Sequence, residues 1–289
     1  MDLSSTGFQV VIQEFKKDKW ALFSFWGLVF LIVAILIMDF FFINQDEVMR
    51  VCLFDKYAKP GEGFILGADQ GGRDIFGQLI IGAKNSILIA ISITVITGVI
   101  GVGIGMITGY FGGWIDHIWM RVIDFFMTLP TLMIIIVFVT IVPKYHVFTF
   151  ILILSIFGWV STARLIRSKT LAESKKDYVY ASKTLGTKNF TIIFREIMPN
   201  LSSILIVELT LNFAGNIGIE TGLSFLGFGL PPDTPSLGTL VSYATNPEIL
   251  ANKWWIWLPA SVLILMLILG INCVGQTLRR AADAKQRFG

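Results

Sequence analysis

Six long apolar runs, separated by polar links of different lengths, dominate the chain. A helix needs roughly 20 predominantly apolar residues to cross the hydrocarbon core of a bilayer, and each run approaches or exceeds that length. The pattern therefore predicts an all-α integral membrane protein with six transmembrane helices. The predicted spans are residues 20–38, 85–114, 125–142, 147–163, 201–229 and 254–278.

The polar links contain further predicted elements. Apolar residues recur at helical spacing over 8–15, which indicates an amphipathic helix lying on the membrane surface. The link 43–83 contains the loop LGADQGGRD at 66–74, and its last part, 75–83, is a second amphipathic element. The longest polar interruption between two spans, DYVYASKTLGTKNFTIIFREIMPN, covers 177–200.

The segment 177–200 has the pattern of two short helices joined at a glycine. We expect Asp177 to cap a helix over 178–185, Gly186 to end it in the left-handed conformation, and Thr187 to cap a second helix. On the first helix Tyr178, Ser182 and Leu185 are expected on one face, with Ala181 beside them. Such a unit suits docking into a groove of another protein. The alternative is a basic loop that merely folds into short helices.

Composition supports the membrane class and narrows the chemistry. Of the 289 residues 54% are hydrophobic and 15% charged, against roughly a quarter charged in soluble domains. Two cysteines and two histidines in unrelated segments predict neither a disulfide framework nor a metal site. A net charge of +3 without a basic, aromatic groove gives no reason to expect nucleic-acid binding. No GxxxxGK[ST] phosphate loop occurs, so ATP hydrolysis by this chain is not expected.

The distribution of basic residues predicts the orientation. With six spans, 16 of the 23 Lys and Arg residues fall on the side that holds both termini and the segment 177–200. The other seven fall on the opposite side. The positive-inside rule therefore places both termini and this segment in the cytoplasm, with the loop 66–74 and the proline-rich loop 230–238 outside.

Several polar or small residues in and near the spans allow more than one interpretation. Glu208 and Glu220 are costly inside a membrane, so both are candidates to line a central passage or its gate. We expect Glu220 to face that passage or a partner chain and to help shape an external gate, or to be a helix-packing carboxylate. Gly101, Gly105 and Gly109 form a stripe suited to close helix packing. Other expectations are a local Arg121–Asp124 pair and an interfacial anchor at Trp254, Trp255 and Trp257.

Four blocks of sequence, in order, resemble one family. They are LGADQGGRDIFGQLIIGA at 66–83, GYFGGWIDHIWMRVIDFFMTLP at 109–130, the segment 177–200, and GLSFLGFGLPPDTPSLG at 222–238. Together they are similar to the permease subunits of the dipeptide/oligopeptide/nickel class of ABC importers, in particular the C-type partner of the two-permease pair. The N-terminal residues 15–31 also fit this family.

The resemblance implies a type I ABC importer permease-like bundle over 66–280, with an N-terminal segment and first span at 1–65 and a tail at 281–289. It implies a prokaryotic plasma-membrane protein with a second permease subunit, two cytoplasmic ATPase subunits that hold ATP and Mg, and an extracellular peptide-binding protein. This chain would bind no cofactor itself. The loop 66–74 also contains Asp69, Arg73 and Asp74, whose two carboxylates supply too few oxygen ligands for calcium. These three residues are expected in turns and helix caps, or in contact with the binding protein.

The resemblance also implies that 177–200 is the coupling helix that seats in the ATPase. The family signature EAA–xxx–G falls on Tyr180, Ala181, Ser182 and Gly186, and its final proline on Pro199. Tyr180 stands where an acidic residue is usual and Glu196 where an apolar one is usual. The implied coupling residues are Asp177, Tyr178, Tyr180, Ala181, Ser182, Leu185, Gly186 and Pro199.

Three rival functions are kept beside a peptide importer. A nickel-importing permease would share the same blocks. A self-contained channel or secondary carrier would show ionisable pairs at mid-membrane or inverted repeats, of which the sequence has few. A membrane-embedded enzyme would need a cluster of catalytic side chains at membrane depth, and none is recognised.

Overall fold

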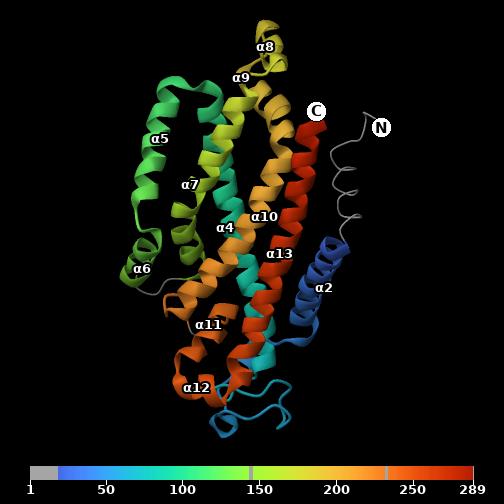
Figure 1. Ribbon diagram of the computed structural model, residues 1–289. Coiled ribbons are helices and arrows are strands. Elements are labelled where there is room, and N and C mark those ends of the chain that lie inside the picture. The colour runs from blue at the N-terminus through green and yellow to red at the C-terminus, as the bar shows by residue number, and fades with distance from the viewer. Residues whose placement is uncertain (1–18, 143–145, 232–233, 289) are drawn as a thin grey trace.

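The computed structural model describes residues 19–142, 146–231 and 234–288, with side chains described to residue 282 (Figure 1). The described residues are helical and contain no strand beyond one isolated bridge between Ala68 and Asp74. The predicted amphipathic helix at 8–15 lies outside them. The helices are α2 Lys19–Phe42, α3 Gln45–Val48, η1 Leu53–Asp55, α4 Ile75–Phe111, α5 Gly113–Thr128, α6 Thr131–Ile141, α7 Val147–Glu173, α8 Asp177–Thr184, α9 Asn189–Thr191, η2 Ile192–Ile197, α10 Met198–Phe225, α11 Leu237–Ser242, η3 Tyr243–Thr245, α12 Pro247–Asn252 and α13 Trp254–Phe288.

Within the described residues, five helical segments are long and apolar enough to cross a membrane. The bent pair α5–α6 brings the number of possible spans to six. The predicted membrane-spanning all-α fold is therefore confirmed. Two boundaries differ from expectation. The amphipathic stretch 75–83 belongs to the same continuous helix as the second span, and the fifth span is continuous with the helical turns before it, from Asn189 to Phe225.

The third predicted span, 125–142, is wrong as a single helix. The chain bends by 79° between α5 and α6. Leu129 ends α5 in an extended conformation, with φ −78° and ψ 138°, and Pro130 follows it. A proline disfavours helical geometry in the residue before it and has no N–H for the helical ladder, so the helix stops here.

Helices α4 and α7 pack backbone to backbone along the glycine stripe. A Cβ atom added to Gly101 would lie 2.8 Å from the carbonyl oxygen of Trp159, and one added to Gly109 would lie 2.6 Å from that of Arg167. Only glycine leaves room for this approach, so the prediction of packing glycines is confirmed.

Ion pairs tie α5 to α7 near the end of the bundle that carries α8. Asp124 pairs with Arg164, and Asp116 accepts hydrogen bonds from Arg167, with its Oδ1 2.8 Å from Nε. The expected pair of Asp124 with Arg121 is therefore wrong. Helix α7 continues ten residues beyond the predicted end of the fourth span, to Glu173. This extension brings its arginines beside α5.

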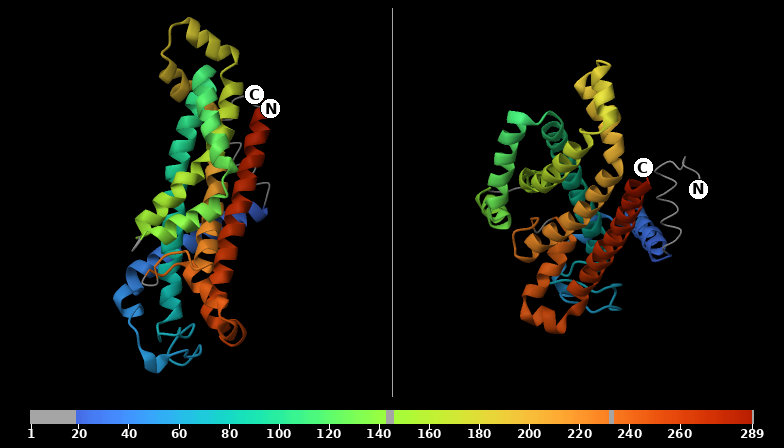
Figure 2. Two further views of the ribbon diagram at one scale, coloured as in Figure 1. Left: turned by 90° about the vertical axis from the view of Figure 1, so that its left-hand side faces the viewer. Right: turned by 45° about the horizontal axis from the view of Figure 1, so that its top comes forward.

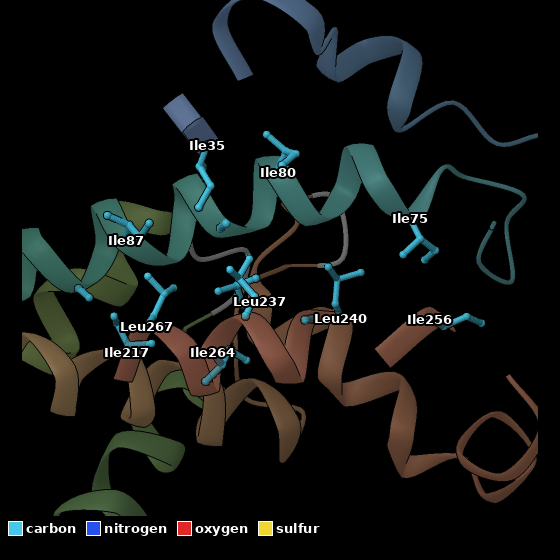
Figure 3. Close-up of a cluster of buried hydrophobic side chains, with 14 of the residues drawn as sticks. Ile35, Ile75, Ile80, Ile87, Ile217, Leu237, Leu240, Ile256, Ile264 and Leu267 are labelled. Atoms are coloured by element: carbon cyan, nitrogen blue, oxygen red, sulfur yellow. The ribbon is translucent and has the colours of Figure 1, made fainter. Parts of the chain in front are cut away.

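The largest hydrophobic core joins the outer segments to the spans. Ile75, Ile80 and Ile87 of α4 pack with α10, α11, α13 and Ile35 of α2 (Figure 3). Trp255 belongs to this core and is 6% exposed, so it is not available as an interfacial anchor, whereas Trp254 is exposed and its anchoring role stays a prediction.

The two ends of the bundle carry different structures. Helix α8 projects from one end. The loop 66–74 before α4, here called the glycine-rich loop, lies with α12 at the other end (Figure 1). Helix α2 packs against α13 on one edge, and α5 with α6 flanks α7 on another (Figures 1 and 2). Any site on α8 is therefore separated from the glycine-rich loop by the full length of the spans.

We predict that alanine at Gly105 destabilises the protein while alanine at Gly103 does not. A Cβ at Gly105 would lie 2.7 Å from the carbonyl oxygen of Ala163, and one at Gly103 meets nothing within 4 Å. Overpacking of this kind costs about 1–3 kcal/mol. Thermal unfolding of the detergent-purified protein should show a lower midpoint for Gly105→Ala only. Equal midpoints for the two variants would contradict the packing account.

Candidate functional site

Helix α8 has the predicted glycine stop but not the predicted caps. Gly186 has φ +80°, the left-handed conformation that glycine adopts without strain, so this part of the prediction is confirmed. The N-cap residues of α8 and α9 are Lys176 and Lys188, and neither makes a side-chain cap bond. The capping roles of Asp177 and Thr187 are therefore wrong. Asp177 lies in the first helical turn, where its charge is favourable to the helix dipole.

The two faces of α8 differ sharply in exposure. Val179 is fully buried and packs in a cluster with residues of α4, α7 and η2, while Tyr178 and Ser182 are half-buried. Ala181 is exposed, and Leu185 is 85% exposed. Leu185 is the C-cap residue of α8, and its N–H still donates to the carbonyl of Ala181. It was expected on one face with Tyr178 and Ser182, but it is far more exposed than either.

The phenol of Tyr178 joins three elements. Its O–H donates to Glu173 Oε1 at 2.9 Å, at the end of α7, and it accepts from Asn200 Nδ2 at 3.1 Å, near the start of α10. Burial, with a smaller effect from Glu173, raises the pKa of Tyr178 to about 12. A raised tyrosine pKa favours the protonated form in the folded state. The link is therefore fully formed below the ordinary tyrosine pKa of 10 and is lost only as the pH rises through about 12.

A second set of bonds fixes the inner side of α8 and α9. Ser182 Oγ donates to Glu196 Oε2 at 2.8 Å, which joins α8 to the π-helical segment η2. The O–H of Tyr110 in α4 donates to Asn189 Oδ1 at 2.9 Å. The ammonium of Lys183 lies 4.5 Å from the centroid of the Tyr110 ring. Glu196 stands where the family motif usually has an apolar residue. Its hydrogen bond from Ser182 is a specific contact that the sequence did not reveal.

Four large apolar side chains are exposed on α8, α9, η2 and the turn between α8 and α9. We define the docking face as Tyr180, Leu185, Phe190 and Phe194, whose exposures are 54%, 85%, 62% and 55%. Pro199 is also exposed, at the second residue of α10 and two residues after the end of η2. The helical ladder changes pattern at this point, as expected before a residue without an N–H.

Glu220 is fully buried at the opposite end of α10. Its Oε1 accepts from Ser224 Oγ at 2.9 Å and from Ser236 Oγ at 2.7 Å, and its Oε2 accepts from Ser86 Oγ at 2.9 Å. Ser236 is also the N-cap of α11. The carboxyl group therefore joins α4, α10 and α11, and this geometry matches the helix-packing alternative. A role at an external gate stays a prediction.

Glu208 and Glu220 belong to one polar ridge on α10, with Asn212 and Asn216 between them at four-residue spacing. Asn212 Nδ2 donates to Thr162 Oγ1 of α7 at 2.9 Å, and Asn216 Nδ2 donates to Thr94 Oγ1 of α4 at 2.9 Å. Glu208 Oε1 is 3.3 Å from Thr162 Oγ1. The four-residue spacing was visible in the sequence and could have identified the two asparagines.

The three candidate contact residues of the glycine-rich loop are mostly enclosed. Asp69 is fully buried and accepts from Gln78 and Tyr243 and from the backbone and side chain of Arg73. Asp74 caps α4, its carboxylate accepting from the backbone N–H groups of Phe76 and Gly77. The expected turn and capping roles are confirmed, while a contact with a binding protein stays a prediction. Among the described residues, no three His, Cys, Asp or Glu side chains group as metal ligands.

Comparison with known proteins identifies a family. Residues 101–287 match the profile of the family described as "Binding-protein-dependent transport system inner membrane component".

The chain belongs to this family.

Three relatives illustrate the membership. The oligopeptide transport system permease protein OppC of Lactococcus lactis subsp. lactis (strain IL1403) is 54% identical over 277 residues, covering 95% of this chain and 93% of that protein. The OppC protein of Mycobacterium tuberculosis (strain ATCC 25618 / H37Rv) is 36% identical over 232 residues, covering 79% and 78%. The dipeptide transport system permease protein DppC of Bacillus subtilis (strain 168) is 34% identical over 275 residues, covering 95% and 85%. This chain is thus a multi-pass permease component of an ABC importer that works with other subunits.

We predict that Glu220→Gln lowers stability more than Glu208→Gln. A glutamine has one acceptor oxygen, so at least one of the three hydroxyl donors at Glu220 loses its acceptor, at a cost of about 1–3 kcal/mol. Glu208 is half-exposed and its two hydrogen bonds are long, at 3.3 Å. Thermal unfolding in detergent should separate the two variants. An equal or larger loss for Glu208→Gln would contradict the importance of the Glu220 cluster.

We predict that Tyr178→Phe loosens α8 from the bundle, while Tyr180→Phe leaves it in place. Both changes remove one hydroxyl, but only that of Tyr178 bonds to α7 and α10. Loss of such bonds costs about 0.5–1.5 kcal/mol, which corresponds to roughly twofold to twelvefold faster amide exchange. Hydrogen exchange over residues 177–184 provides the measurement. Unchanged exchange in Tyr178→Phe would show that the phenol does not hold α8.

Proposed function

We propose that this chain is one of two permease subunits of an ATP-driven peptide importer and that α8 with α9 couples it to cytoplasmic ATPase subunits. The unit formed by α8 and α9 is here called the knuckle. The observation that carries the proposal is that its two sides differ. Its inner side is bonded to α4, α7, η2 and α10, while its docking face is exposed at the end of the bundle.

The docking face has the chemistry of a seat for another protein. Exposed aromatic and aliphatic side chains on a rigid helical unit gain free energy when a partner removes them from water. Tyr180, at the usual position of an acid, contributes a ring in place of a charge. Docking therefore depends on shape and apolar contact more than on an ion pair.

Movement of the knuckle would reach the spans directly. Tyr178 is bonded to both α7 and α10, so a displacement of α8 acts on two membrane helices at once. Helix α7 is in turn packed along the glycine stripe of α4. Closure of the ATPases on bound ATP would supply the force, and this chain would transmit it without hydrolysing ATP.

The relatives support a peptide cargo. The proteins from Lactococcus lactis and Mycobacterium tuberculosis are named as oligopeptide permeases, and the one from Bacillus subtilis as a dipeptide permease. We propose the same cargo class for this chain, delivered by an extracellular binding protein and passed along a path shared with the second permease. Family membership argues against the self-contained channel or carrier, since the family works with binding proteins. Nickel stays an alternative cargo that the structure does not favour.

The distribution of basic residues supports the orientation. With α8 in the cytoplasm, the lysine- and arginine-rich segments lie on the cytoplasmic side, and the glycine-rich loop and α12 face the binding protein. Both termini are then cytoplasmic, in a prokaryotic plasma membrane.

Co-purification tests the proposed assembly. The affinity-tagged chain, extracted in mild detergent from its own host, should bring along a second permease and two ATPase subunits or domains. Mass spectrometry of the purified complex identifies them. Purification of the chain alone in a form that still transports peptide would overturn the proposal.

We predict that Gly186→Val uncouples the complex while Thr187→Val does not. A Cβ at Gly186 meets nothing within 4 Å, so any defect comes from forcing a β-branched residue to φ +80°, which redirects α9 and the docking face. Peptide uptake should fall about tenfold or more, with equal amounts of the chain in the membrane. Thr187 makes no side-chain bond that the structure shows and serves as the neighbouring control. Normal uptake by Gly186→Val would contradict the coupling role.

A further inference from the structure

A cleft of about 620 Å³ is lined in part by residues of α11. Figure 1 shows α11 toward the end of the bundle opposite α8. The walls of the cleft come from the end of α6, the loop after α10, the segment α11–η3, and the glycine-rich loop with the start of α4. Sites for small ligands typically measure about 300–1,000 Å³, so the space is sufficient for several residues of an extended peptide. The cleft lies on the side where a binding protein would release its cargo under the proposed orientation.

Arg73 is the one charged residue among the described residues that line the cleft. Its Nε donates to Asp69 Oδ2 at 2.8 Å and its Nη2 donates to the Tyr243 hydroxyl at 3.1 Å. A guanidinium carries five N–H groups, and no described residue accepts from Nη1. The side chain is therefore held in place by two partners and keeps donors for a ligand.

The carboxylate of Asp69 offsets the charge of Arg73 through their ion pair. The carboxylate is fully buried and also accepts from the Gln78 amide and the Tyr243 hydroxyl. Burial, with a smaller effect from the charge of Asp69, raises the pKa of Tyr243 to about 12, so this hydroxyl keeps its proton at neutral pH. A simple anion gains little binding free energy from an arginine whose charge is already offset by a carboxylate. A ligand that also uses the surrounding amide and apolar groups gains more.

The remaining lining supplies those groups. The Gln78 amide uses its Nε2 on Asp69 and Arg73, which leaves its Oε1 as an acceptor. The lining also includes Val139, Val142, Leu230 and Pro231, here called the apolar wall. A fixed donor, a fixed acceptor and an apolar wall are the three features that an extended peptide end can satisfy at once.

We propose that this cleft binds the carboxyl end of a peptide, with the carboxylate on Arg73 and the adjacent peptide N–H on Gln78. The inference rests on the proposed function and deepens it, because it identifies a substrate contact within this chain. The ligand's side chains lie along the apolar wall. Ser224 also lines the cleft and donates to Glu220, so the cleft is linked through one hydrogen bond to the cluster that joins α4, α10 and α11.

Disulfide capture in the assembled complex tests the proposal. The background is a complex in which Cys52 and Cys273 are serine and which still imports peptide. Ser242→Cys places a thiol in the cleft, and Thr245→Cys places one on the adjacent turn outside it. The two native hydroxyls make equivalent bonds to backbone carbonyls three residues earlier, so the changes are matched. The probes are alanine hexapeptides with an activated cysteine at the carboxyl or the amino end.

Each capture rate is divided by the rate with a small methanethiosulfonate reagent, which corrects for accessibility. We expect the carboxyl-end probe to react at least about tenfold faster with Ser242→Cys than with Thr245→Cys, and faster than the amino-end probe. Arg73→Lys keeps the charge but loses the planar fork, and should reduce this capture severalfold. Excess hexapeptide without cysteine should compete, and the same peptide with an amidated carboxyl end should not.

Equal normalised rates at the two cysteines, equal capture of the two probes, or full competition by the amidated peptide would overturn the proposal. Competition by phosphatidylglycerol vesicles but not by peptide would assign the cleft to a lipid headgroup and would overturn it as well. Uptake of peptide without cysteine, measured with the same complex reconstituted in vesicles, separates the claim about the cleft from the proposed function. Uptake without selective capture rejects the cleft alone, whereas capture without ATP-dependent uptake rejects the proposed function.

Discussion

The interior of a bilayer offers no water to polar side chains, and this constraint determines how α10 sits in the protein. Its ridge of Glu208, Asn212, Asn216 and Glu220 has to find partners on neighbouring helices. Those partners are hydroxyls of α4, α7 and α11. The bonds define both the rotation of α10 about its axis and its height against α4 and α7. The glycine stripe then brings α7 against α4 closely enough for the three helices to act as one unit.

This arrangement gives α10 a mechanical role along its length. The helix continues without a gap from α9 and η2, where Ser182 and Tyr178 attach the knuckle, to Glu220, where α11 is attached. The proposed docking face at one end and the cleft at the other therefore share one continuous helical segment. Polar groups that would be a liability in lipid are here the contacts that hold the two ends in register.

The sequence predicted what depends on local pattern. Apolar length predicted the spans, Gly186 the left-handed stop, the four-residue glycine spacing the close packing, and Asp74 a helix cap. It failed where the outcome depends on residues distant in the chain. Asp124 pairs with Arg164 and not with Arg121, because α7 continues past the predicted end of its span. Ser182 donates to Glu196, fourteen residues away, and Asp69 accepts from Tyr243. Pro130 alone predicts the bend, but the continuous apolar run around it favoured a single straight span.

ATP-driven peptide uptake into proteoliposomes tests most directly whether the knuckle drives transport. The complete complex is reconstituted with its binding protein, and the initial rate of accumulation of a radiolabelled oligopeptide is measured for the parent and for a variant with Leu185→Asp and Phe190→Asp in the docking face. The account predicts ATP-dependent accumulation above the external concentration by the parent and its loss in the variant, with the variant chain still inserted beside its partner permease. Accumulation at the parental rate in the variant, or equilibration without ATP in the parent, would contradict it.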